Sequence, residues 1–511
     1  MYEPESFGER AARAARSNIL LSPVIALTGL VSSIVVVRVL APQAFALYAL
    51  AIALRGGIQF VADLGFGGAS ARAFAEFQER GVRGQAQRVY ARLAVIRAAI
   101  VIALAAAVAS APDAFSELLN LRKDEGYFLV FLVVIGAAEI AGGLGFYVLA
   151  GTLNHSTINK VLLAQSIVQP PLVITAAFAG LGLSGILAAV VLGSLFRAVA
   201  LTGGSTRAIR RIEDRGAEIE GIAASYMQVA SASTVGKVAG VLHSRQVVIP
   251  IVFSAVARSQ VAVFSVAYDW VQQLLTVVSG PLYSLLLPVF SAQRRDDEFV
   301  RRFFQFATRS LALVVFPTAA VLLAVFPSMA AVVLPGAYSH EYAKATAFAY
   351  VFIPCIALEI VLSGPATALM LAHEGLASPY RNVKLVTAAL AAVYVVTAGI
   401  DLLVVAGFMM AIRLASVFAL HAELQRRLGL HVKVSWLARA VAASLISAAS
   451  AAAVAAILPG RVGDLALGPV VGLSTFLMLV RITRLLHEAD AAIAARVLPF
   501  GSRPLRLLMF S

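Results

Sequence analysis

Long apolar stretches, each about the length of a helix that crosses a membrane, recur from one end of the chain to the other. A spanning helix needs about 20 predominantly apolar residues, because the hydrocarbon core of a bilayer is about 30 Å thick. Of the 511 residues, 60% are hydrophobic and only 13% are charged, whereas soluble domains carry about 25% charged residues. One soluble core could not hold so many apolar helices. The sequence therefore predicts an all-α, polytopic membrane protein.

We predict about fourteen transmembrane helices from these stretches. They lie near 17–37, 44–64, 90–110, 127–150, 160–180, 182–204, 226–252, 260–290, 305–333, 345–371, 382–399, 401–422, 436–458 and 466–486. The basic N-terminal stretch leads directly into the first span, so we expect no cleavable signal peptide. The connections are short, and the longest external one, near 111–126, is too small for a folded domain. Function must therefore reside between the helices.

Three internal connections are predicted to form short amphipathic helices on the membrane surface. They are the stretches 65–89, 205–225 and 291–304, and the tail after Leu486 is predicted to lie at the interface as well. In the first stretch, Arg72, Glu76 and Arg80 recur every four residues and so share one helix face.

Basic residues gather in every second connection, which orients the spans. One set of connections holds most of them, including Arg72, Arg80, Arg210, Arg211, Arg294, Arg295, Arg426 and Arg427, whereas the other set has few, such as Arg122 and Arg258. Positive charge collects in cytoplasmic loops. Both termini are therefore predicted to be cytoplasmic. The net charge of +14 then reflects topology and contact with anionic membrane lipids, and no nucleic acid partner is expected.

An internal repeat divides the predicted spans into two blocks of six. Residues 45–66 align without gaps against residues 261–282, and each segment is the second span of its block. We therefore predict a six-helix lobe at 1–225, a second six-helix lobe at 226–435, and two last spans with an interfacial tail at 436–511. Parallel repeats of this kind place a transport site near the membrane midplane, between the lobes.

Two sequence segments resemble the amino-terminal signature of polysaccharide and O-antigen flippases, which belong to the multidrug/oligosaccharidyl-lipid/polysaccharide exporter superfamily. The segments are "VVVRVLAPQAFALYALA" and "VADLGFGGASARAFAE", and the matching positions are Arg38, Leu40, Pro42, Phe45, Tyr48, Asp63, Leu64, Gly65, Arg72, Ala75 and Glu76. Ala46 departs from the usual glycine. Further matches are "FVRRFFQFATRSLALVVFP" at 299–317 and "VLPGAYSHEYAKATAFAYVFIP" at 333–354.

The resemblance implies a non-enzymatic flippase in the bacterial inner membrane. Its cargo would be an undecaprenyl-pyrophosphate-linked glycan, moved from the cytoplasmic to the outer leaflet for cell-surface polysaccharide synthesis, such as O-antigen or exopolysaccharide. Other polysaccharide assembly proteins would be its partners. The resemblance does not specify the glycan, because members of the family differ in cargo.

Charged residues inside the second span are the first candidates for the cargo site. A charge at the bilayer centre costs about 2.5 kcal/mol or more, so it faces a cavity or a partner. Arg55 and Gln59 lie on one stripe, and a guanidinium binds phosphate through a rigid fork. The alternative is that Arg55 pairs within the protein and holds the span to its neighbour. Asp63 is interpreted as a structural residue at the helix end.

The seventh and eighth spans supply the other candidates. Lys237 and Arg245 project beside a row of small residues, and Asp269, Gln272 and Gln273 share one face of the eighth span. The predicted substrate-binding residues are Arg55, Gln59, Lys237, Arg245, Gln272 and Gln273. Asp269 either forms a salt bridge with Lys237 or Arg245, or titrates during transport.

Two further acids lie within predicted spans. Glu139 and Glu359 are, with Asp269, the candidates for proton or sodium coupling; the alternative is that each is a paired structural carboxylate. Arg97 and Arg197 lie within about two turns of the cytoplasmic face and are predicted to extend toward the interface.

Two other functions account less well for these residues. A multidrug antiporter of the same superfamily would favour acidic and aromatic residues around its cargo, whereas Arg55, Lys237 and Arg245 outnumber the acids here. A membrane glycosyltransferase or polymerase would need catalytic residues on a sizeable external loop. No nucleotide-binding Gly-x4-Gly-Lys-Ser/Thr loop and no metal-binding motif is present, and Cys355 is the only cysteine. We therefore expect neither a cofactor nor a metal.

Overall fold

A computed structural model gives the fold. It describes residues 24–25, 27–63, 66–152, 154–215, 241–242, 244–292, 296–372, 376–397, 401–457, 461–483, 485 and 490. Every regular element among these residues is a helix, and the one bridge of β type joins Val82 to Asp214. The predicted all-α class is confirmed.

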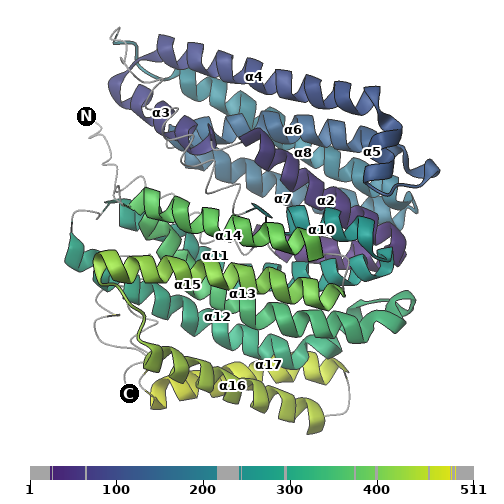
Figure 1. The fold of residues 1–511 in the computed structure, drawn as a ribbon, viewed down its shortest axis with the longest axis vertical. Coiled ribbons are helices and arrows are strands. Elements are labelled where there is room, and N and C mark those ends of the chain that lie inside the picture. Colours follow the sequence, from purple (N-terminus) through teal and green to yellow (C-terminus); the bar gives the residue numbers. More distant parts are fainter. Residues whose placement is uncertain are drawn as a thin grey trace. The chain divides into compact units, whose positions relative to one another are not determined.

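Ten helices in the described part of the chain are long and apolar enough to cross a membrane. They are α4 (Arg83–Ser110), α6 (Tyr127–Gly151), α7 (His155–Phe178), α8 (Gly182–Arg210), α11 (Arg258–Ala292), α12 (Asp297–Val333), α13 (Tyr342–Ala372), α15 (Leu402–Leu428), α16 (Val434–Ile457) and α17 (Arg461–Ile482). Each coincides with one predicted span (Figure 1). The chain is a multi-pass membrane protein.

The other four predicted spans also coincide with helices. Two of these helices are α2 (Pro42–Asp63) and α14 (Ala377–Thr397). The other two are the shorter apolar helices Leu27–Val39 and Arg245–Ala255, the second of which is α10. Both match their predicted spans only in part, since residues 1–23 and 216–240 lie outside the described residues.

The predicted surface helices are only partly correct. Helix α3 (Phe66–Arg80) is a separate amphipathic element, but residues 83–89 belong to α4. The stretch 291–304 is not a helix of its own, because α11 runs to Ala292 and α12 begins at Asp297. The carboxylate of Asp296 accepts the backbone N–H of Phe299 at 2.9 Å, which caps the start of α12.

The connection 111–126, predicted to be external, holds a short helix, α5 (Pro112–Leu118), and one turn of 3-10 helix, η1 (Lys123–Glu125). Arg258 fastens this connection to the start of α11. Its guanidinium donates to both carboxylate oxygens of Glu125, at 2.6 and 2.9 Å, and to the Asn120 carbonyl at 2.6 Å.

The chain forms two compact units. The N unit comprises Val31–Ser265 and Lys384–Leu402, and the C unit comprises the described residues of Met1–Leu30, Val266–Val383 and Leu403–Ser511. Helix α11 therefore begins in the N unit and continues in the C unit. The lobes predicted at 1–225 and 226–435 remain a prediction.

Helix α6 is the central helix of the N unit, and small residues let its neighbours approach closely. A Cβ atom at Gly145 would lie 2.7 Å from the carbonyl carbon of Leu201 in α8, and one at Gly142 would lie 3.2 Å from the Ala198 Cα. Small residues at such crossings allow close backbone packing within a membrane. This packing fixes the distance between polar side chains of α6 and α8.

Gly145→Ala is expected to destabilise the N unit. The added methyl group would overlap the backbone of Leu201, and overpacking of this kind costs about 1–3 kcal/mol. The measurement is the midpoint of thermal unfolding of the purified protein in detergent. Gly203→Ala in α8 is the matched control, because no atom lies within 4 Å of its added Cβ. If Gly145→Ala had the same midpoint of thermal unfolding as the control, the contact between α6 and α8 at Gly145 would have room for a methyl group, contrary to this prediction.

In the C unit, α12 packs against α13, α16 and α17. Ser447 of α16 donates its hydroxyl to the Gly472 carbonyl of α17 at 2.6 Å, and the indole N–H of Trp436 donates to the Leu485 carbonyl at 2.8 Å. Helix α13 carries Pro354 and Pro365 within its length. A proline removes one bond of the helical ladder and allows bending at that point.

Candidate functional site

A buried carboxylate lies between two arginines in the N unit. Glu139 of α6 is fully buried, and Arg55 of α2 donates from Nε to its Oε1 at 2.7 Å. Arg197 of α8 donates from Nη2 to the other oxygen, Oε2. Both arginine side chains are 17% exposed. We name these three residues the Glu139 cluster.

The Glu139 cluster carries a surplus of positive charge. Two guanidinium cations face one carboxylate, so one positive charge is left over. Among the described residues, Arg55 forms its hydrogen bond through Nε alone, and a guanidinium has five N–H donors. No residue that the structure describes accepts a hydrogen bond from the terminal nitrogens of Arg55.

Arg97 also binds α6, and the prediction that Arg97 and Arg197 extend to the interface is wrong. Arg97 is 7% exposed and donates from Nη1 to the Ile140 carbonyl at 2.7 Å. Arg197 pairs with Glu139. The physical reason is that a carboxylate and a carbonyl inside the unit satisfy both guanidinium groups, so neither needs to reach the membrane surface.

Arg245 lies in the same part of the N unit as Arg55. It begins α10, whose next residue, Gln246, packs so tightly on α2 that a Cβ at Gly56 would lie 2.9 Å from the Gln246 Cγ. The charges of Arg245 and Arg55 both act on the hydroxyl of Tyr48 in α2. Two of the predicted cargo-binding cations are thus neighbours.

The structure shows less about the other polar residues of the N unit that the sequence singled out. Gln59 follows Arg55 by one turn on α2 and is exposed. Lys237 lies outside the described residues, and nothing is described of the side chain of Asp63. Their predicted roles stay predictions.

The C unit holds a second buried ion pair. Arg413 of α15 contacts Glu359 of α13, with 2.6 Å between Nη2 and Oε2, and the two side chains are 13% and 20% exposed. Arg413 also donates from Nη1 to the Tyr268 hydroxyl of α11 at 2.7 Å. We name Tyr268, Glu359 and Arg413 the Glu359 cluster. One cation faces one anion here, so the cluster is neutral.

The polar face of α11 lies in the same unit. Gln272 donates to the Thr276 hydroxyl at 3.2 Å. The side-chain oxygens of Gln272 and Gln273 are buried and accept no hydrogen bond from any residue that the structure describes. Unsatisfied buried acceptors are costly, and the role of both amides in cargo binding stays a prediction. Asp269 also has an interaction partner.

Comparison with known proteins places the chain in a family. The sequence profile of a family described as "Polysaccharide biosynthesis protein" matches residues 35–347, which is more than half of the chain. The chain is a member of the polysaccharide biosynthesis protein family. Comparison with curated proteins finds no sequence match.

Solved structures of transporters share the fold of this polysaccharide biosynthesis protein. One is a lipid II flippase MurJ in an inward closed conformation, with a TM-score of 0.67 at 12% identity, over 91% of this chain and 98% of that one. Another is a multidrug resistance MATE family transporter of the MOP superfamily, in an inward-facing conformation, with a TM-score of 0.62 at 14% identity over 82% and 98%.

A third similar structure is a MOP superfamily transporter from Pyrococcus furiosus. Its TM-score is 0.58 at 14% identity, over 84% of this chain and 99% of that one. Identities this low establish the fold and nothing finer. The predicted resemblance is therefore confirmed for the family and for the fold.

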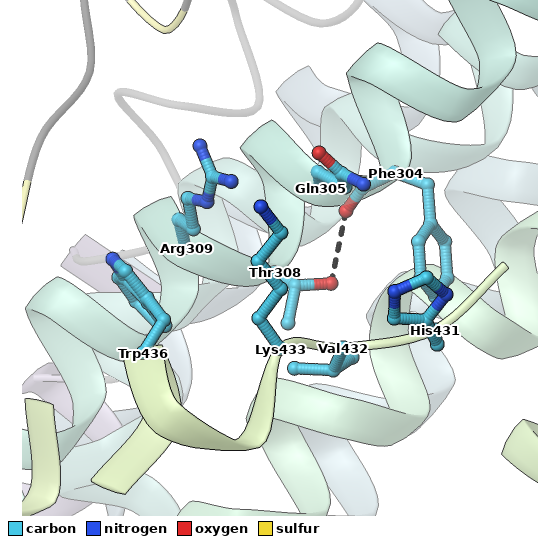
Figure 2. Close-up of a pocket in the computed structure, with 8 residues that line it drawn as sticks. All are labelled: Phe304, Gln305, Thr308, Arg309, His431, Val432, Lys433 and Trp436. Carbon is cyan, nitrogen blue, oxygen red and sulfur yellow. Dashed lines mark hydrogen bonds between the residues drawn. The ribbon is translucent and has the colours of Figure 1, made fainter. Parts of the chain in front are cut away.

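A small pocket in the C unit of this family member was not predicted (Figure 2). It lies between α12 and the start of α16 and is lined by Phe304, Gln305, Thr308, Arg309, His431, Val432, Lys433 and Trp436. Its volume is about 20 Å³, which is room for about one water molecule. The guanidinium of Arg309 already faces Asp490 at 3.3 Å. The pocket is too small for a glycan and is not a candidate transport site.

Arg197, Arg413 and Tyr268 were not predicted from the sequence as members of the two clusters. The sequence could have indicated both arginines as partners of the buried acids, because each buried acid requires a cation. Arg197 and Arg413 are the arginines within the apolar parts of their spans. No group of three or more potential metal ligands occurs among the described residues.

Proposed function

We propose that this protein is a flippase that moves undecaprenyl-pyrophosphate-linked glycan from the cytoplasmic to the outer leaflet of the bacterial inner membrane. Both termini are cytoplasmic, transport proceeds by alternating access, and no covalent chemistry takes place. The product serves cell-surface polysaccharide synthesis, such as O-antigen or exopolysaccharide. The membership in a polysaccharide biosynthesis family and the transporter fold support this proposal.

The observation that carries the proposal is the surplus charge of the Glu139 cluster. A positive charge inside a membrane unit is costly unless an anion accompanies it, and the pyrophosphate of a lipid-linked glycan is such an anion. Arg55 offers the fork geometry that phosphate oxygens accept. The charge of Arg245 acts, like that of Arg55, on the hydroxyl of Tyr48. We propose that Lys237 contributes a further positive charge to the same site. Gln59, Gln272 and Gln273 are proposed to bind glycan hydroxyls.

A multidrug antiporter of the same superfamily is the second candidate, because transporters of that class share the fold. Such a protein would hold a cationic cargo with a carboxylate. The carboxylates of Glu139 and Glu359 are already paired with arginines. This pairing disfavours a cationic cargo. Asp269 also has a partner, so pairing alone does not select among the three proposed ion-coupling residues, Asp269, Glu139 and Glu359.

The test is flipping by the purified protein in sealed vesicles. Vesicles would carry a fluorescent short-chain polyprenyl-pyrophosphate oligosaccharide in both leaflets, and a membrane-impermeant quencher would report its movement. We expect transfer to be faster than in protein-free vesicles and unchanged oligosaccharide length at the end. Movement of a cationic dye in place of the glycan lipid would favour the antiporter, and a lengthened glycan would favour a polymerase.

A further inference from the structure

The sequences of α6 and α13 share a short segment that contains the buried acid. Residues 137–140 read Ala-Ala-Glu-Ile and residues 357–360 read Ala-Leu-Glu-Ile. The helices α8 and α15 share a second pattern, because Arg197 and Arg413 precede the basic pairs Arg210–Arg211 and Arg426–Arg427 by the same number of residues. Helices α6 and α13 are the fourth spans of the two predicted blocks, and α8 and α15 are the sixth.

The two units repeat the same contacts at these positions. In each unit, the glutamate of the fourth span pairs with the arginine of the sixth, as Glu139 with Arg197 and Glu359 with Arg413. The next carbonyl along the helix also accepts a side-chain donor in both units. Arg97 donates to the Ile140 carbonyl at 2.7 Å, and Tyr283 donates to the Ile360 carbonyl at 2.9 Å. The glutamate–arginine pair is therefore a repeated part of the architecture.

The clusters differ in the residue that the second span of each block supplies. In the N unit this residue is Arg55 of α2, which binds Glu139 directly. In the C unit it is Tyr268 of α11, which accepts a hydrogen bond from Arg413. The second span thus supplies a cation to one cluster and a neutral phenol to the other. The Glu139 cluster has one positive charge, and the Glu359 cluster has none.

We propose that Arg197 is a positioning residue that keeps the charge of Arg55 available for the cargo pyrophosphate. Arg197 neutralises Glu139 and occupies its Oε2, so that Arg55 meets only Oε1 and keeps its terminal nitrogens for an anion. Without Arg197, the carboxylate would take Arg55 as its only counter-ion in a bidentate pair, which is the strongest arrangement of these two groups. The site would then be neutral and would lose its attraction for pyrophosphate. This inference rests on the proposed function.

The test compares the affinity of purified variants for farnesyl pyrophosphate, with farnesol measuring the contribution of the apolar tail. Arg197→Gln should weaken pyrophosphate-dependent binding at least tenfold. Glu139→Gln should bind at least as tightly as the wild type. The double variant Glu139→Gln/Arg197→Gln should recover affinity to within about threefold of the wild type, because no carboxylate remains to capture Arg55. A purely structural role of Arg197 predicts no such recovery.

The Glu359 cluster provides the matched control. Arg413→Gln with Glu359→Gln removes the equivalent ion pair from a neutral cluster without leaving a buried charge unpaired, so it should leave the affinity for farnesyl pyrophosphate within about twofold of the wild type. If Arg197→Gln fails to fold, the single variants Arg197→Lys and Glu139→Gln take its place in the test. Each of these two variants should bind farnesyl pyrophosphate as tightly as the wild type or more tightly. Weaker binding by Glu139→Gln would overturn the positioning role.

Different results would contradict the anion site at Arg55 and the positioning role of Arg197. If the wild type does not bind farnesyl pyrophosphate beyond farnesol, or if Arg55→Gln binds as well as the wild type, the anion site of the proposed function is wrong. If Arg55→Gln loses binding but the double variant is as weak as Arg197→Gln, the anion site stands and only the positioning role of Arg197 is wrong.

Discussion

Removal of the positive charges of Arg55, Lys237 and Arg245 is expected to abolish glycan export while the protein still accumulates in the membrane. Arg55→Gln alone should lower the flipping rate at least about 100-fold, because it removes charge-assisted hydrogen bonds to pyrophosphate of about 1.5–3 kcal/mol each. The fold should survive, since Arg197 still pairs with Glu139. The measurement is the flipping rate in sealed vesicles at equal protein content.

Arg92→Gln is the control for this result. Arg92 is an exposed residue of α4, and its replacement removes the same charge without touching the Glu139 cluster. It should flip at the wild-type rate. Normal export by the variant in which Arg55, Lys237 and Arg245 are all neutral would show that the cargo anion is recognised elsewhere.

Arg413→Met is expected to give the largest loss of stability. The change leaves Glu359 without its cation and Tyr268 without its donor. Breaking a buried pair by removal of one partner costs about 3–5 kcal/mol. Thermal unfolding in detergent would report this loss through tryptophan fluorescence, because Trp270 lies in the same helix as Tyr268 and is 1% exposed.

A second substitution distinguishes the loss of the ion pair from the loss of side-chain packing as the cause of the lower stability. Glu359→Gln combined with Arg413→Met leaves no charge unpaired, so it should recover most of the lost stability. Arg301→Met, an exposed change in α12 of the same unit, should have almost no effect. If Arg413→Met unfolds at the temperature of Arg301→Met, the Glu359 cluster does not hold α13 and α15 together.

Several features of this protein follow from local sequence alone. The apolar stretches gave the helices that cross the membrane, since the thickness of the bilayer fixes how long each stretch must be. Short motifs around Arg38, Asp63 and Arg72 identified the family. The cost of burying charge also singled out Arg55, Glu139 and Glu359 as residues that need a partner or a cavity. None of these inferences requires knowledge of which helices are neighbours.

Tertiary structure decided which partner each charge has. Glu139 lies 84 residues from Arg55 and 58 residues from Arg197, and no local pattern links positions so far apart. The close approach of α8 to α6 at Gly142 and Gly145 brings Arg197 to the carboxylate. Arg197 therefore binds Glu139, whereas the sequence had predicted that it extends to the interface. Local sequence determines how long a helix is and which of its faces are polar, whereas the partner of a buried charge depends on the packing of distant helices.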